Sequence, residues 1–91
     1  MYTFPVFFRA IGHPVRQKII SILHAEQELP VNRLVDELKL SQSTVSHHLS
    51  ILKKANIVAA REEGAQTKYS ICCDTIASCC AGLQKHFHCR K

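Results

Sequence analysis

Residues 40–49 read LSQSTVSHHL and contain a helix start, an apolar stripe and a polar face. Ser41 is predicted to be the N-cap, since its hydroxyl can accept a hydrogen bond from the free amides of the first turn. The leucine before the cap and Val45 after it are spaced as a hydrophobic staple. Val45, Leu49 and Leu52 recur at helical spacing and are predicted to point inward. The pattern predicts a helix that starts after Ser41, which we call the reader helix.

The outer face of the reader helix carries small, hydrogen-bonding side chains: Gln42, Ser43, Thr44, Ser46 and His47. A glutamine can pair with adenine through two hydrogen bonds, and serine or threonine can bond to either kind of base. Small side chains at the N-terminal end allow a helix to enter the major groove. We therefore predict that this face reads DNA. His48 is predicted to be packed and hydrogen-bonded, leaving His47 as the exposed histidine.

Three helices are predicted before the reader helix. The apolar residues of Phe4–Ile11 are spaced for one helical face. Pro14 suits the first turn of a second helix, which is predicted to end in a polar turn at residues 26–28. A short third helix follows, with an apolar stripe from Leu34 to Leu38.

A hairpin and a final helix are predicted after the reader helix. Val58–Glu62 and Thr67–Ile71 are strand-like runs, joined by a turn at residues 63–66. Asp74 is a suitable N-cap for the last helix. This order predicts a single domain over residues 1–91, mainly α with a β-hairpin wing, which is a winged helix-turn-helix.

The charge balance favours a polyanionic partner. The chain has 91 residues, with 12 Lys and Arg against 7 Asp and Glu, a net charge of +5. No acidic residue occurs between Ser41 and Arg61, a stretch that also contains Lys53. We predict that Lys53, Lys54 and Arg61 belong to a phosphate-facing surface. Arg61, Gln66 and Lys68 lie on the hairpin, where a wing would touch the DNA backbone or minor groove.

Several functional classes are not expected. The longest apolar run is a few residues, so no transmembrane helix is predicted. The first residues have no basic segment ahead of a long apolar stretch, so a secretory signal is not expected. No Ser/His/Asp order, carboxylate pair or glycine-rich phosphate loop is present, so the chain is not predicted to be an enzyme.

Four segments together resemble the arsenic-repressor (ArsR/SmtB) family of small winged-helix regulators. They are AIGHPVR at residues 10–16, the run at residues 40–49, Leu-Lys at residues 52–53 and Tyr-Ser-Ile at residues 69–71. The resemblance covers nearly the whole chain. It implies a homodimer built from the first and last helices, binding to an inverted repeat in double-stranded DNA, and release when an effector binds.

A two-fold dimer also agrees with the size of the chain. So small a domain cannot hide every apolar side chain of its terminal helices, and a partner would cover the remainder. These side chains are Phe4, Phe7, Phe8, Ile76, Leu83 and Phe87.

All five cysteines lie in the last twenty residues, which is unlike a secreted disulfide scaffold and indicates a reduced, cytoplasmic protein. The resemblance implies two known kinds of metal site. The Cys-x-Cys pattern that many members carry before the reader helix is missing, because Val35–Leu38 has no cysteine. The zinc ligands that other members carry on their last helices correspond here to Cys73, Thr75, His86 and Cys89.

The cysteines leave three interpretations open. Soft thiolates select soft ions, so the first is a site for As(III) or another soft metal ion, acting as effector and not required for the fold. The second is a thiol redox or persulfide switch. The third is packing, since free cysteine behaves as a small hydrophobe. A winged-helix module that binds protein instead of DNA is the alternative of another class. The candidate ligands are Cys72, Cys73, Cys79 and Cys80.

Overall fold

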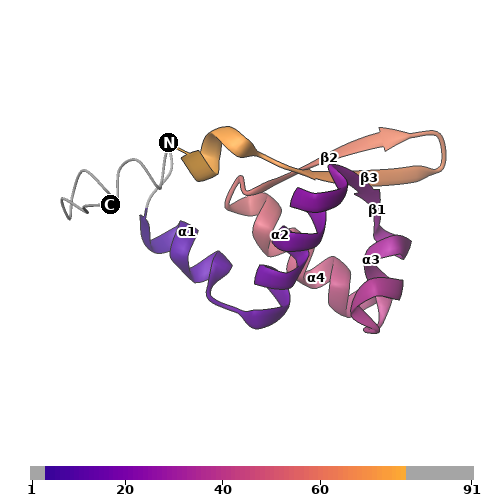
Figure 1. The fold of residues 1–91 in the computed structure, drawn as a ribbon, viewed down its shortest axis with the longest axis horizontal. Coiled ribbons are helices and arrows are strands. Elements are labelled where there is room, and N and C mark those ends of the chain that lie inside the picture. Colours follow the sequence, from indigo (N-terminus) through magenta and orange to yellow (C-terminus); the bar gives the residue numbers. More distant parts are fainter. Residues whose placement is uncertain (1–3, 78–91) are drawn as a thin grey trace.

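The structure, a computed structural model, describes residues 4–77 and contains five helical segments and three strands in that range. A last helical segment occupies residues 73–77. The other elements are α1 (Phe4–Ile11), α2 (Pro14–Glu26), β1 (Glu28–Pro30), α3 (Val31–Leu38), α4 (Gln42–Lys54), β2 (Val58–Glu63) and β3 (Gln66–Ile71). The winged helix-turn-helix is confirmed, with α4 as the reader helix (Figure 1).

Capping groups mark the start of α2 and the end of α3. Pro14 stands in the first turn of α2, and the Nδ1 atom of His13 accepts a hydrogen bond from the Val15 amide at 3.1 Å. Between α3 and α4, Lys39 takes a left-handed conformation with φ of 59°, and its amide donates to the Val35 carbonyl at 2.8 Å. This cap ends α3 abruptly and leaves a short connection to Ser41, which produces the helix-turn-helix.

The sheet is antiparallel with the strand order β1-β3-β2. Its edge strand β1 corrects the sequence prediction, which had only a polar turn at residues 26–28. Glu28, Leu29 and Pro30 pair with Ser70, Tyr69 and Lys68. A strand of three residues is too short to show the alternation of apolar and polar residues that marks a strand in the sequence. Its strand conformation depends on pairing with β3, which lies far away in the sequence.

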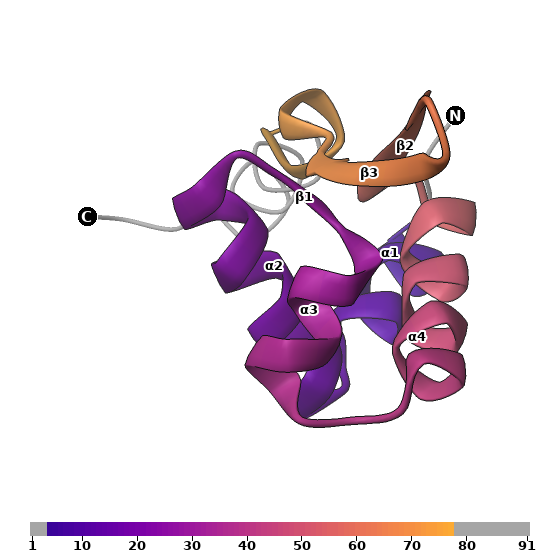
Figure 2. The same cartoon turned by 90° about the vertical axis from the view of Figure 1, so that its right-hand side faces the viewer.

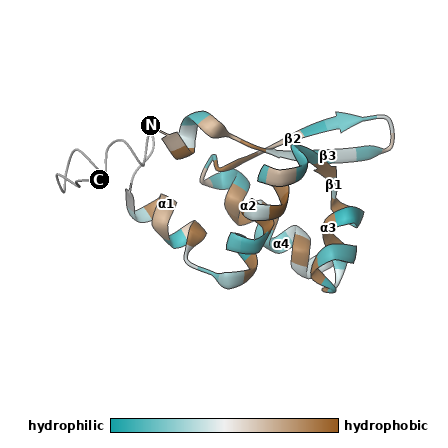
Figure 3. Cartoon of the chain, viewed as in Figure 1, coloured by the Kyte–Doolittle hydropathy of each residue, from teal (hydrophilic) through white to brown (hydrophobic). Residues whose placement is uncertain are grey.

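The hairpin is longer and its turn tighter than predicted. β2 extends to Glu63 and β3 begins at Gln66, so only Gly64 and Ala65 form the turn. Gly64 has φ of 63°, a conformation that the first residue of such a turn requires and that glycine adopts without strain. The outer end of β2 is hydrophilic, as Figure 3 shows.

The last helix begins earlier than predicted. Residue 73 is already helical, and the amides of Thr75 and Ile76 both donate to the Cys72 carbonyl, at 3.1 and 3.4 Å. Asp74 therefore lies in the first turn and is not the N-cap. A carboxylate there is favourable because the first turn carries the positive end of the helix dipole.

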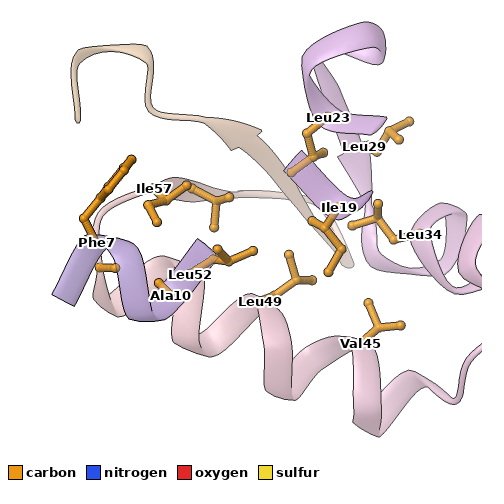
Figure 4. Packing of buried hydrophobic residues seen from close by; sticks show 12 residues of the cluster. Phe7, Ala10, Ile19, Leu23, Leu29, Leu34, Val45, Leu49, Leu52 and Ile57 are labelled. Atoms are coloured by element: carbon orange, nitrogen blue, oxygen red, sulfur yellow. The ribbon is translucent and has the colours of Figure 1, made fainter. Parts of the chain in front are cut away.

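The core lies between the helices and the sheet (Figure 4). Ile19, Leu34 and Val45 are fully buried and come from α2, α3 and α4. Phe7 of α1, which the sequence analysis placed among side chains for a partner to cover, is 5% exposed and belongs to this chain's own core. Phe8 is 38% exposed. Leu83 and Phe87 lie outside the described residues. The other buried apolar residues are Ala10, Leu23, Leu29, Leu49, Leu52, Ala55, Ile57 and Val58.

Within residues 4–77, no helix is both long and apolar enough to cross a membrane.

Candidate nucleic-acid interface and thiol pair

The reader helix starts as its sequence predicts. The Ser41 hydroxyl accepts a hydrogen bond from the Thr44 amide at 3.2 Å, which confirms Ser41 as the N-cap. The same hydroxyl donates to the Thr44 hydroxyl at 2.8 Å. Thr44 is half-buried, so the structure places this predicted DNA contact within the cap. Thr44 therefore stabilises the first turn of α4, and its contact with DNA stays a prediction.

The outer face of α4 is exposed. Gln42, Ser43, Ser46 and His47 are all exposed, whereas the inward stripe of Val45, Leu49 and Leu52 is buried. Lys53 is exposed in the last turn of the helix. Figure 2 shows α4 along one side of the molecule, with β2 and β3 above it. A helix with one buried face and one polar face at the edge of the molecule can enter a groove of DNA.

His48 is packed and hydrogen-bonded, as predicted. It is 7% exposed, and its Nδ1 atom accepts a hydrogen bond from the Arg16 side chain at 3.2 Å. Arg16 also donates to the carbonyls of Arg9 and Ala10, at 3.0 and 3.2 Å. One guanidinium thus joins the end of α1 to the reader helix. The ring centroids of His13 and His47 lie 4.6 and 5.5 Å from that of His48.

Burial, and then the neighbouring His13, Arg16 and His47, lower the pKa of His48 below its usual value. The unfolded chain therefore binds this proton more readily, so the stability that His48 contributes is full above about pH 6.5 and is lost as the pH falls. We expect the urea midpoint of unfolding to drop between about pH 7.5 and about pH 5, and to drop less in His48→Gln. The control is His24→Gln, which changes an exposed histidine of α2. Equal pH dependence in the wild type and His48→Gln would contradict this assignment.

The two faces of the sheet differ in chemistry. Leu29, Tyr69 and Ala60 are in register across the strands, and Leu29 is buried, so this row faces the helices. Arg61 and Lys68 form the neighbouring pair. Side chains alternate along a strand, so both cations lie on the other face, away from the helices.

Both predicted wing cations are held by carboxylates. The guanidinium of Arg61 donates to both carboxylate oxygens of Glu28, at 3.0 and 2.8 Å, and lies 3.5 Å from Glu63. The Lys68 ammonium lies 2.8 Å from Glu63. The hydrogen bond from Arg61 lowers the pKa of Glu28, and that from Lys68 lowers the pKa of Glu63. These ion pairs offset the charge that the sequence analysis assigned to phosphate contact.

A surface hollow of about 330 Å³ lies where the reader helix, α3 and the hairpin meet. It brings Gln42 and Ser46 of the reader helix together with residues of the hairpin that are far away in the sequence. Asn32, Thr67 and Tyr69 are the members that sequence reasoning missed, because no local pattern marks them. Its hydrogen-bonding side chains are Asn32, Gln42, Ser46, Gln66, Thr67 and Tyr69.

The two described cysteines are adjacent free thiols at the start of the last helix. Cys72 is partly buried and Cys73 exposed, and both line a hollow of about 370 Å³ with Asn56, Asp74 and others. The Cys72 amide donates to the Ile57 carbonyl at 2.8 Å, and the Ile57 amide donates to the Leu52 carbonyl of the reader helix at 2.9 Å. Burial, and then nearby Cys73 and Asp74, raise the pKa of the Cys72 thiol.

The described residues do not form a complete metal site. Within residues 4–77, no group of three or more His, Cys, Asp or Glu side chains is placed to hold a metal ion. Thr75, at a position that corresponds to a zinc ligand in other family members, is 1% exposed and packed inside. The candidate ligands Cys79 and Cys80 lie outside the described residues, as do His86 and Cys89.

Comparison with known proteins gives consistent matches. Residues 13–60 match the family model described as "Bacterial regulatory protein, arsR family". An HTH-type transcriptional regulator of Methanocaldococcus jannaschii is 46% identical over 69 residues, which cover 76% of this chain and 78% of that protein. A transcriptional repressor SmtB homolog of Synechocystis is 42% identical over 65 residues, covering 71% of this chain and 48% of that protein. The crystal structure of Mycobacterium tuberculosis Rv0081 aligns with a TM-score of 0.71 and 34% identity, covering 90% of this chain and 82% of that one.

Proposed function

This chain belongs to the ArsR family of DNA-binding transcriptional regulators, and from that premise we propose that it is a homodimeric repressor relieved by a soft metal or metalloid. Because the family and the relatives are regulators and not enzymes, the expectation that the chain has no catalytic activity is confirmed. The proposed partner is an inverted-repeat operator in double-stranded DNA, in the reduced cytoplasm. The proposed effector is arsenite or an ion of similar softness.

The observation that best supports DNA binding by this protein is the exposed, polar face of α4. Its side chains Gln42, Ser43, Ser46 and His47 stand on a helix whose other face is anchored in the core, so the reading groups are held in place by packing. A rigidly held helix loses little entropy when it enters the major groove, and its donors can meet base edges directly. Lys53 adds a cation at the far end of the same helix for phosphate contact.

A two-fold pair is the proposed form because an inverted repeat presents two equivalent half-sites, about one helical turn apart. Val6 and Phe8 of α1 are 47% and 38% exposed, and apolar area of this kind favours a second copy as its cover. Sedimentation or light scattering should therefore give twice the mass of the chain. If the protein were a monomer at micromolar concentration, the proposal that a homodimer binds an inverted repeat would be contradicted.

The effector site is proposed around Cys72 and Cys73. Two adjacent thiols, one exposed, can supply two ligands to a soft ion, and Cys79 or Cys80 would supply a third. Ile57, which accepts the hydrogen bond from the Cys72 amide, donates its own amide to the Leu52 carbonyl of α4, so this segment is linked to α4 through one residue. For release, the effector must bind better to the state with low DNA affinity than to the state with high affinity.

We expect arsenite to weaken operator binding by roughly five- to 150-fold in the wild type, the usual range of allosteric coupling. The double variant Cys72→Ser/Cys73→Ser should bind the operator as the wild type does and lose this response, because serine hydroxyls do not bind soft ions. The matched control is Cys89→Ser, which changes a cysteine outside the proposed pair. The measurement is fluorescence anisotropy of a labelled promoter fragment in reducing buffer.

The outcomes separate the alternatives. A wild-type affinity that does not change with arsenite, zinc or cadmium in reducing buffer would exclude the metal sensor. A loss of affinity on oxidation or persulfide treatment that the double variant does not show would instead favour the redox switch. Weak binding to every duplex that does not depend on salt would favour a protein-interaction module, since phosphate contact always produces a salt dependence.

A further inference from the structure

Arg16 of α2 is a side chain that connects three helices. Its Nη1 atom donates to the carbonyls of Arg9 and Ala10 in the last turn of α1, at 3.0 and 3.2 Å, and its Nε atom donates to the Nδ1 atom of His48 in α4, at 3.2 Å. The last carbonyls of a helix have no partners within the helix, so the guanidinium completes the end of α1. Its donors form a planar, rigid fork. One rigid group thus contacts α1 and the reader helix at the same time.

The contact on the reader helix is a titratable ring. The Nδ1 atom of His48 accepts a hydrogen bond only while it carries no proton. Among residues 4–77, no carboxylate forms an ion pair with Arg16, and His48 is 7% exposed, so little water can replace the ring as acceptor. His47, whose ring centroid lies 5.5 Å from that of His48, is exposed on the polar face of α4. A movement of His48 would therefore shift a side chain that is predicted to read DNA.

We infer that Arg16 is a positioning residue for DNA binding, which holds the reader helix in place through the neutral ring of His48, and that protonation of this ring releases the helix. The proton comes from solvent and occupies the nitrogen that accepted the bond, so two cationic donors then face each other with no acceptor between them. A reader helix that is held less firmly must be ordered when it enters the groove, which lowers the affinity. The inference rests on DNA binding by α4 and adds the proton as a signal besides the proposed metal.

The groups around His48 set the direction of the pH dependence. They are His13, which precedes α2, Arg16 of α2 and His47 of α4, and no carboxylate of the described residues is among them. Burial and these neighbours lower the pKa of His48, so the ring takes up its proton only below about pH 6.5. Protonation of the exposed His47 acts in the opposite direction, because an added positive charge strengthens the attraction to phosphate. The link must therefore be detected as a difference between two proteins and not in the pH profile of one.

The first comparison is between the wild type and His48→Gln, because the carbonyl of a glutamine side chain can accept the bond from Arg16 but does not titrate. Affinity for a mixed-sequence duplex of roughly 30 base pairs is measured by anisotropy at constant low salt, from about pH 7.5 to about pH 5.5. We expect the ratio of wild-type to variant affinity to fall roughly three- to tenfold over this range, which corresponds to one hydrogen bond. Circular dichroism at each pH verifies that both chains are folded. The matched control is His24→Gln, at an exposed position of α2, which should follow the wild type.

The second comparison removes the guanidinium. At about pH 7.5, Arg16→Gln and Arg16→Lys should each weaken binding roughly three- to tenfold, since an ammonium has no planar fork with which to bond to α1 and His48 together. The slope of log affinity against log salt should equal that of the wild type, because Arg16 is expected to contact no phosphate. The matched control is Lys18→Gln, which removes one positive charge from an exposed position of the same helix and should bind nearly as the wild type does.

Three results would each overturn the inference. Equal pH profiles of the wild type and His48→Gln would show that the proton on His48 has no effect on binding. Wild-type affinity in Arg16→Lys would show that the charge, and not the directed bonds, is what matters. A salt slope reduced by about 0.9 in Arg16→Gln, beyond any change in Lys18→Gln, would place Arg16 on phosphate.

Two further points keep the test decisive. If Arg16→Gln does not fold, His48→Gln still tests the link, because it retains an acceptor for Arg16. A wild-type chain with no salt-dependent binding at any pH would instead overturn the DNA-binding function itself, so the two failures can be told apart.

Discussion

Leu52→Ala is expected to lower the free energy of unfolding by about 2–5 kcal/mol, which is a large part of the roughly 5–15 kcal/mol that holds a small domain folded. Leu52 is fully buried in the last part of the reader helix, beside Ala10 and Ile57 (Figure 4). Truncation removes apolar contacts and leaves a cavity that neighbours from three different segments cannot all close. Urea unfolding followed by circular dichroism measures the loss.

The control for Leu52→Ala is Ser50→Ala, two residues earlier on the same helix. Ser50 is exposed, and alanine is the better helix former, so its unfolding free energy should stay within about 0.5 kcal/mol of the wild type. Equal stability of the two variants would mean that α4 does not pack against the core as described. The same measurement also shows whether a loss of DNA binding in any variant reflects unfolding.

Ser46→Glu is expected to reduce affinity for duplex DNA by at least roughly a hundredfold. The new carboxylate would lie in the middle of the exposed face of α4. In the complex it would either be repelled by a phosphate or be buried without a partner, and either effect costs several kcal/mol. Glutamate is also a good helix former, so the fold should be retained. Anisotropy on a mixed-sequence duplex at low salt measures the change.

The matched control is Ser21→Glu, which makes the same chemical change at an exposed position of α2 and alters the net charge equally. Only a smaller, long-range effect of one added negative charge is expected there, because the attraction or repulsion between charges falls with distance and position 21 is not on the exposed face of α4. An equal loss of affinity in the two variants would show that net charge, and not the face of α4, governs binding.

Local patterns were sufficient for the helices and for part of the site. The N-cap at Ser41 and the apolar stripe through Val45, Leu49 and Leu52 predicted the reader helix, because capping and periodicity act within a few residues. The inward position of His48 followed from its neighbours on the same helix. The identity of the family was visible for the same reason, since residues 13–60 hold these local signals in a fixed order.

Contacts between distant residues were not predictable in this way. The strand at Glu28–Pro30 exists only because β3 pairs with it. Arg61 and Lys68 were predicted as phosphate contacts from their charge, but the charge of a side chain does not reveal the face of the sheet on which it lies. The ion pair of Arg61 with Glu28 joins residues that are 33 positions apart.

The amino-acid sequence alone determined which segments are helical, which face of α4 is polar and to which family the chain belongs. Only the tertiary structure decided where the carboxylates meet the cations of the hairpin and which neutral side chains surround the hollow beside α4. The physical reason is that helix formation depends on neighbours within about four residues, whereas strand register and side-chain pairing depend on chain segments that packing brings together.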